Sequence, residues 1–121
     1  MQYYGDIYDE RWYRETNDVN YFALNPRYQE IIKLHDMLVE HDVPHALRRV
    51  FDGWQVCYPT DGDWIMSVIE HKGSYGADSD ELEIMGLLTP EEETWDDVSG
   101  YLTAEEVFER VLEHYTKTNR H

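Results

Sequence analysis

The alternation of hydrophobic and polar residues is clearest between residues 45 and 71, where it predicts antiparallel strands. Residues 54–58 (WQVCY) alternate in the manner of a strand that buries one face. Residues 64–71 are apolar on both faces over their first half, as in a strand that is covered on both sides. A β-prone run at 45–51 precedes them, and a fourth short strand is predicted at 81–85.

Turn residues separate these runs. Asp52-Gly53 favours a two-residue hairpin turn, because both positions of such a turn need φ > 0 and these residues tolerate it. Pro59 cannot donate a ladder hydrogen bond and should end the second strand. A second turn at 60–63 leads into the third strand. The simplest prediction is an antiparallel meander of three or four strands.

Helical periodicity brackets the strands. The first helix is predicted at 26–42, with Asn25 as the cap, Pro26 at the first helical position and an apolar stripe at Ile31, Leu34, Leu38 and Val39. The fold class is therefore α+β, with two main helices packed on one face of the sheet.

Two capping boxes mark the second half of the chain. Thr103 and Glu106 begin the second main helix, predicted at 104–117. Thr89 and Glu92 are expected to open only a short turn that ends before Gly100. Trp64 and Phe108 are predicted to lie in the core.

The chain divides into an aromatic-rich N-terminal arm at 1–24 and a single α+β domain at 25–121. The arm holds seven of the seventeen aromatic residues: Tyr3, Tyr4, Tyr8, Trp12, Tyr13, Tyr21 and Phe22. Either it docks these side chains on a partner or a second subunit, or it folds back irregularly over its own domain.

Composition favours a cytoplasmic protein. The single cysteine, Cys57, excludes an internal disulfide and is expected to be a small core residue. No apolar run approaches the ~20 residues of a membrane span, and residues 1–15 lack the apolar segment of a signal peptide.

The net charge of −16 is unevenly distributed. Residues 61–121 carry 16 acidic and 4 basic residues, whereas residues 1–60 carry 10 and 6. Such a field repels phosphate backbones and anionic membranes, so direct binding of nucleic acid is not expected. The expected partner is a basic protein surface. The alternative is that the acidity only keeps the protein soluble.

The acidic residues concentrate between 78 and 97, and no Lys or Arg lies between Lys72 and Arg110. Pairing within the segment cannot neutralise these charges. The predicted partner-binding residues are Glu70, Tyr75, Asp78, Asp80, Glu81, Glu83, Glu91, Glu92, Glu93, Asp96 and Asp97, together with Tyr3, Tyr4, Tyr8 and Trp12 of the arm.

No catalytic or metal motif stands out. His35 and His41 are six residues apart, which does not fit the i,i+4 spacing of a helical metal pair, so an exposed face or a helix end is the better interpretation. No nucleophile and base occur at a recognisable spacing. We therefore expect no metal, no cofactor and no enzymatic activity.

The segments SYGADSDELEIMGLLTPEE and VSGYLTAEEVFERVLEHY, preceded by GWQVCYP, resemble short uncharacterised acidic proteins of phages and prophages of Gram-positive bacteria. The resemblance covers roughly residues 45–116. It implies a protein that binds and disables host machinery, including defence nucleases, or one that sequesters nucleotide signals. From the acidic surface we expect the first of these, a nucleic-acid mimic that occupies the basic groove of a host protein, for example a CRISPR effector.

A second function stays open, namely an oligomeric protein that binds and sequesters a nucleotide. Its base would stack on Trp54, Tyr58, Trp64 and Tyr75, and its phosphate would be held by Arg48 and Arg49. A homodimer is compatible with either function.

Overall fold

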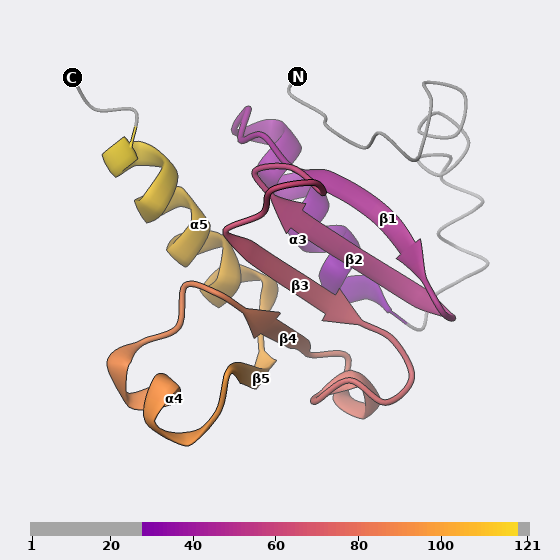
Figure 1. Cartoon of the computed structure of the whole chain (residues 1–121). Coiled ribbons are helices and arrows are strands. Elements are labelled where there is room, and N and C mark those ends of the chain that lie inside the picture. Colours follow the sequence, from indigo (N-terminus) through magenta and orange to yellow (C-terminus); the bar gives the residue numbers. More distant parts are fainter. Residues whose placement is uncertain (1–27, 119–121) are drawn as a thin grey trace.

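The computed structural model describes residues 28–118 of the chain and confirms the α+β class (Figure 1). Five strands form one antiparallel sheet and pair in chain order: β1 (Ala46–Val50), β2 (Gly53–Tyr58), β3 (Met66–Glu70), β4 (Leu82–Met85) and β5 (Val98–Leu102). The helices of the described part are α3 (Gln29–Glu40), α4 (Pro90–Trp95) and α5 (Ala104–Thr118), and a 3₁₀ turn, η1 (Ala77–Ser79), precedes β4.

The sheet has five strands where three or four were predicted, because β5 forms at 98–102, where no strand was expected. The short turn expected after Thr89 is the six-residue helix α4. Leu82 pairs with Leu102 and Ile84 pairs with Ser99, so Gly100 and Tyr101 together oppose a single residue of β4. This is a β-bulge, which interrupts the alternation of side chains. The bulge, together with the Ser and Gly in VSGYL, hides the strand from a periodicity argument.

The first hairpin turn lies one residue earlier than predicted. Val50 pairs with Gly53, so the two turn residues are Phe51 and Asp52, and Phe51 adopts a left-handed φ of 56°. Gly53 serves a different purpose. A Cβ atom at Gly53 would lie 1.9 Å from the backbone oxygen of Glu70, so the close approach of β3 requires glycine here.

The core lies between the helices and one face of the sheet. Strand residues such as Val56, Val68 and Ile84 form one buried cluster with residues of α3 and α5. Phe108 of α5 is buried, as predicted. Trp64 was wrongly assigned to the core, because it lies in the β2–β3 connection and is 38% exposed.

Helix α3 begins at Gln29 and ends at Glu40, inside the predicted range, and the cap predicted at Asn25-Pro26 lies outside the described residues. Tyr28 precedes the helix but its side chain makes no capping bond. Distant carboxyls take that role. Asp80 accepts hydrogen bonds from the N–H groups of Gln29 (2.9 Å) and Glu30 (3.1 Å), and Glu70 accepts one from Ile31 (3.2 Å).

The start of α5 combines a local and a distant cap. The predicted capping box is present, because Glu106 N–H donates to Thr103 Oγ1 and Thr103 N–H donates to Glu106 Oε1. In addition, Ala104 N–H donates to the carboxylate of Glu30, which ties α5 to the first turn of α3. Within residues 28–118, no helix has the length and apolar character needed to cross a membrane.

Candidate functional site

Glu70 was wrongly predicted to lie on the acidic surface. Its side chain is fully buried on the core face at the end of β3. Burial, followed by the nearby carboxyl of Asp80, raises the pKa of Glu70 to about 9. Glu70 is therefore a neutral, internal helix cap at pH 7 and cannot contact a partner in this fold. Asp80 accepts hydrogen bonds from the same first turn of α3, so this carboxylate is also occupied within the fold.

Glu92 is also occupied within the fold. Its carboxylate accepts two hydrogen bonds from Arg110 of α5 (2.7 and 2.9 Å), one from the Ser99 hydroxyl (2.8 Å) and one from Thr89 N–H (2.8 Å). The Arg110 guanidinium is the main cause that lowers the pKa of Glu92 to about 2. The sequence showed no cation between Lys72 and Arg110, but the fold brings Arg110 itself back onto this segment.

The remaining predicted acids stay accessible. They form two groups, one at each end of β5: Glu91, Glu93, Asp96 and Asp97 on and after α4, and Asp78, Glu81 and Glu83 beside η1 and β4. None of these seven residues takes part in an ion pair between two described residues; those pairs are Lys33–Glu105, Arg110–Glu92 and Lys117–Glu113.

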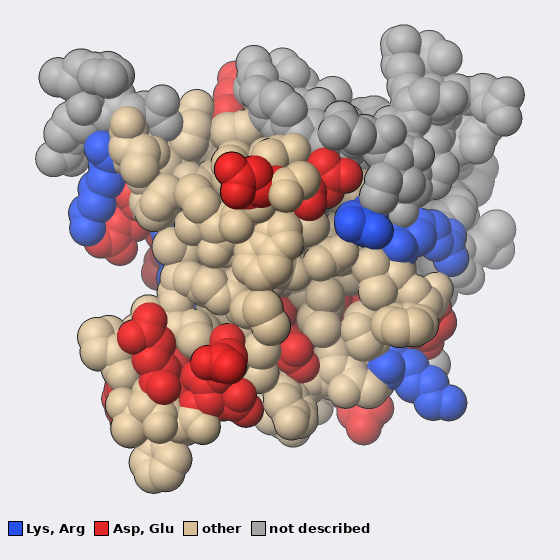
Figure 2. Space-filling model, viewed as in Figure 1, with Lys and Arg blue, Asp and Glu red and all other residues tan. Residues whose placement is uncertain are grey.

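The charge is therefore grouped, but it does not form one continuous patch. Figure 2 shows acidic side chains around α4 at the lower left, a separate group at the β2–β3 connection near the top of the view, and a largely uncharged area between them. Basic side chains lie at the right of this face and at its upper left.

Three exposed aromatic residues accompany the two acidic groups, and only Tyr75 was predicted. Trp95, the last residue of α4, is 83% exposed; Tyr101 in the β5 bulge is 64% exposed; and Tyr75 is 53% exposed. We call these three residues and the seven accessible acids the β5 surface. A usable signal for Trp95 was its position after a short capped helix and before two aspartates, where no apolar periodicity demands burial.

The arm residues Tyr3, Tyr4, Tyr8 and Trp12 lie outside the described residues, so their predicted contacts stay a prediction.

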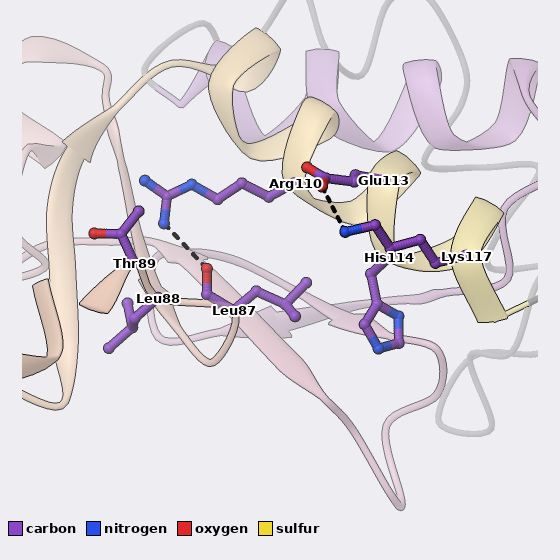
Figure 3. A pocket seen from close by; sticks show the side chains of 7 residues that line it. All are labelled: Leu87, Leu88, Thr89, Arg110, Glu113, His114 and Lys117. Carbon is purple, nitrogen blue, oxygen red and sulfur yellow. Dashed lines mark hydrogen bonds and ion pairs between the residues drawn. The ribbon is translucent and has the colours of Figure 1, made fainter. Parts of the chain in front are cut away.

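A pocket of about 290 Å³ lies between residues 87–89 and α5 (Figure 3). Its basic groups already have partners. Arg110 donates to the Leu87 carbonyl and to Glu92, Lys117 pairs with Glu113, and His114 Nδ1 lies 2.8 Å from the Tyr58 hydroxyl. The two full cations are each matched by a carboxylate, so the pocket offers no net positive charge to an anionic ligand.

Three histidines, His35, His41 and His45, make contacts within the fold. His35, predicted on an exposed face or at a helix end, is fully buried instead, and its Nδ1 lies 2.8 Å from Nε2 of the buried His45. Burial lowers the pKa of His35 well below its usual value and that of His45 to about 4, so both are neutral at pH 7. Nδ1 of His41, predicted at a helix end, lies 2.8 Å from the Met37 carbonyl at the end of α3.

Cys57 is buried, as predicted, and burial raises the pKa of its thiol to about 11. No group of three or more His, Cys, Asp or Glu residues within 28–118 is arranged to hold a metal ion.

The nucleotide-binding set is not brought together. Trp54 and Tyr58 are buried in the core, where their ring faces cannot stack on a base. Arg49 lies over the Trp54 ring, with its guanidinium carbon 5.0 Å from the ring centroid.

Comparison with known proteins gives no further assignment: no protein-family model, curated protein or solved structure matches this chain.

Proposed function

We propose that the protein is a non-enzymatic binding protein whose β5 surface docks on a basic surface of another protein. One observation carries this proposal, namely that exposed aromatic residues accompany accessible acids at both ends of β5, and that these acids have no ion-pair partner among the described residues. Aromatic anchors provide most of the energy of protein–protein contacts, and complementary charge speeds the encounter and selects the partner.

The arrangement around α4 supports this use. Glu91, Glu93, Asp96 and Asp97 are exposed and flank the exposed ring of Trp95. Glu92, the one acid of this helix that points inward, is fixed by Arg110 and so anchors the short helix to α5. The segment is therefore held in place while its outer charges stay in water.

The narrower proposal is that binding inhibits a host protein of a Gram-positive bacterium, in line with the resemblance to phage proteins. Carboxylates spaced along a surface can replace phosphates in a groove that normally binds nucleic acid. A defence nuclease, including a CRISPR effector, has such a groove. Inhibition would then follow from occupancy alone, without chemistry on the target.

The test begins with partners captured from a Gram-positive bacterial lysate at low salt and identified by mass spectrometry. We expect the affinity for the partner to fall steeply as salt rises, because screening weakens contacts between charged surfaces. The triple variant E91Q/E93Q/D97N should weaken binding at least tenfold.

The matched control is E40Q/D63N/E109Q, which removes the same number of charges from exposed positions away from α4. Its affinity should stay within about twofold of the wild type at a salt concentration near 0.15 M, where charges more than ~8 Å apart are largely screened. A flat salt response, or equal losses in the two triple variants, would remove the proposal.

A further inference from the structure

We infer that Tyr75 and Tyr101, with the carboxylates of Glu81 and Glu83, form a binding site for an arginine side chain of the partner. This inference rests on the proposed function and names the contact chemistry at one end of the β5 surface.

The two tyrosines are fixed next to each other although 26 positions separate them in the chain. Tyr101 N–H donates to the Tyr75 carbonyl oxygen at 3.3 Å. At Gly100, a Cβ atom would lie 2.3 Å from Cβ of Tyr75, so the absence of a side chain at Gly100 allows this contact. Both positions are therefore set by backbone contacts, which hold them more firmly than side-chain packing alone would.

Packing does not explain the conformation of Tyr101. The residue adopts a left-handed φ of 62°, which is unfavourable for a residue with a bulky side chain, and its ring is still 64% exposed. Sites of backbone strain often coincide with binding positions. Here the strained residue exposes an aromatic side chain, and its backbone is bonded to that of Tyr75, a second exposed aromatic residue.

Two carboxylates lie beside the pair. Glu83 accepts a hydrogen bond from Tyr75 N–H at 2.8 Å, so its carboxylate is held at the base of the loop. Glu81 N–H donates to the Gly76 carbonyl at 2.9 Å, which places Glu81 next to the residue that follows Tyr75. Neither carboxylate has an ion-pair partner among the described residues.

An arginine suits these groups better than other cations. A guanidinium is planar and stacks on an aromatic face while its N–H groups donate to a carboxylate, whereas an ammonium group is a point charge without a stacking face. Neither tyrosine ring packs against another aromatic ring of the described residues, and both residues are more than half exposed, so part of each side chain is open to a partner.

The experiment uses the full chain and three capped peptides that differ only in containing arginine, lysine or the neutral isostere citrulline. We expect the arginine peptide to bind most tightly and to shift the NMR signals of the Tyr75 and Tyr101 rings. Y75A and Y101A should each weaken its binding about five- to tenfold. E83Q should weaken binding several-fold, while its amide oxygen can still accept the bond from Tyr75 N–H.

Two variants separate binding from folding. Y101G removes the ring at a position whose φ suits glycine, so it should fold as well as the wild type and bind as weakly as Y101A. F51A removes another exposed aromatic residue, at the β1–β2 turn, and should leave the affinity unchanged.

The outcomes distinguish this site from the proposed function. Full affinity of Y75A and Y101G for both the peptide and the captured partner, with a loss in E91Q/E93Q/D97N, would overturn the arginine site and leave the proposed function intact. Equal affinity for the arginine and citrulline peptides would also overturn it. Failure of the wild type to bind any basic peptide or salt-sensitive partner would remove both.

Discussion

The side chain of Glu70 lies under the first turn of α3, where Oε1 accepts the Ile31 N–H. Its second oxygen, Oε2, has no hydrogen-bond partner among the described residues. A proton on that oxygen removes the cost of a buried charge, and this is the physical reason for the raised pKa. The folded protein therefore keeps a proton that the unfolded chain releases above about pH 4.5.

Linkage fixes the sign of the resulting pH dependence. The stability that Glu70 contributes is complete below its unfolded pKa and is lost as pH rises toward its folded pKa of about 9. Glutamine mimics the protonated form and cannot ionise. We expect E70Q to match the wild type near pH 4.5 and to be more stable by on the order of 4 kcal/mol at pH 8, because each unit of the pKa shift from 4.5 to about 9 is worth about 1.4 kcal/mol. Urea unfolding at both pH values measures this difference.

Exposed E93Q on α4 is the control for E70Q and should show no such divergence between the two pH values. A constant difference between E70Q and the wild type across this range would mean that Glu70 is ionised in the folded protein.

The β1–β2 turn allows a second test at the residue scale. Phe51 is 85% exposed and left-handed, so F51G should relieve backbone strain and raise the free energy of unfolding by about 1 kcal/mol. G53A should lower it by more than that, because its Cβ would collide with the Glu70 carbonyl oxygen. Thermal unfolding of both variants should give shifts of opposite sign; equal signs would contradict the turn assignment.

At the scale of elements, the helices differ in how they begin. Helix α5 has a capping box whose two members, Thr103 and Glu106, are only three positions apart, so the sequence reveals it directly. Helix α3 is capped by Asp80 and Glu70, which lie some 40 to 50 residues further along the chain. No local pattern encodes such a cap, so its acceptors, Asp80 and Glu70, were assigned to a binding surface instead.

This arrangement predicts that Asp80 stabilises α3 from a distance. D80A should lower the free energy of unfolding by about 1–2 kcal/mol, the usual cost of losing a helix cap. It should also speed amide exchange at Gln29 and Glu30. D80N keeps an acceptor oxygen and tolerates the left-handed backbone at this residue (φ 55°), so its loss should be smaller.

Local signals explain which elements the sequence predicted correctly. The alternation at 54–58, the stripes of both main helices and the two capping boxes depend on neighbours within a few residues. Strand β5 was missed because its bulge breaks the alternation at Gly100 and Tyr101. The turn was misplaced because Gly53 is required by the approach of β3, a contact that only the folded sheet creates.

The same distinction applies to the candidate site. Acids in the run after Thr89 stay at the surface, as a charged run suggests, but Glu92 turns inward because Arg110 returns to it from α5. Tyr101 was missed because its local sequence gives no sign of its exposure, whereas the signal for Trp95, its place before two aspartates at the end of a short helix, was present in the sequence but was not used.

At the scale of the whole molecule, the net charge affects the stability of the fold, whereas the positions of the charged residues affect binding to a partner. A net charge of −16 destabilises the compact state by self-repulsion, which salt screens. We expect E91Q/E93Q/D97N and E40Q/D63N/E109Q to raise the melting temperature at low salt by similar amounts. Both gains should shrink at about 0.5 M salt, because the Debye length there is only a few ångströms.

Calorimetry at two salt concentrations measures the melting temperatures of the two triple variants and the wild type. If only E91Q/E93Q/D97N were stabilised, the acids on and after α4 would repel one another as a local cluster. Their effect would then belong to that cluster and not to the total charge.

Long-range capping also has a consequence for synthesis on the ribosome. The segment of α3 emerges from the exit tunnel before residues 70–80, which carry its carboxyl acceptors 39 to 51 positions further along the chain, have emerged from it. Until then its first amides have only water as a partner, and an isolated helix of 12 residues is marginal in water. The amino-terminal helix of the described domain should therefore consolidate late, after the third strand and the turn beyond it have emerged.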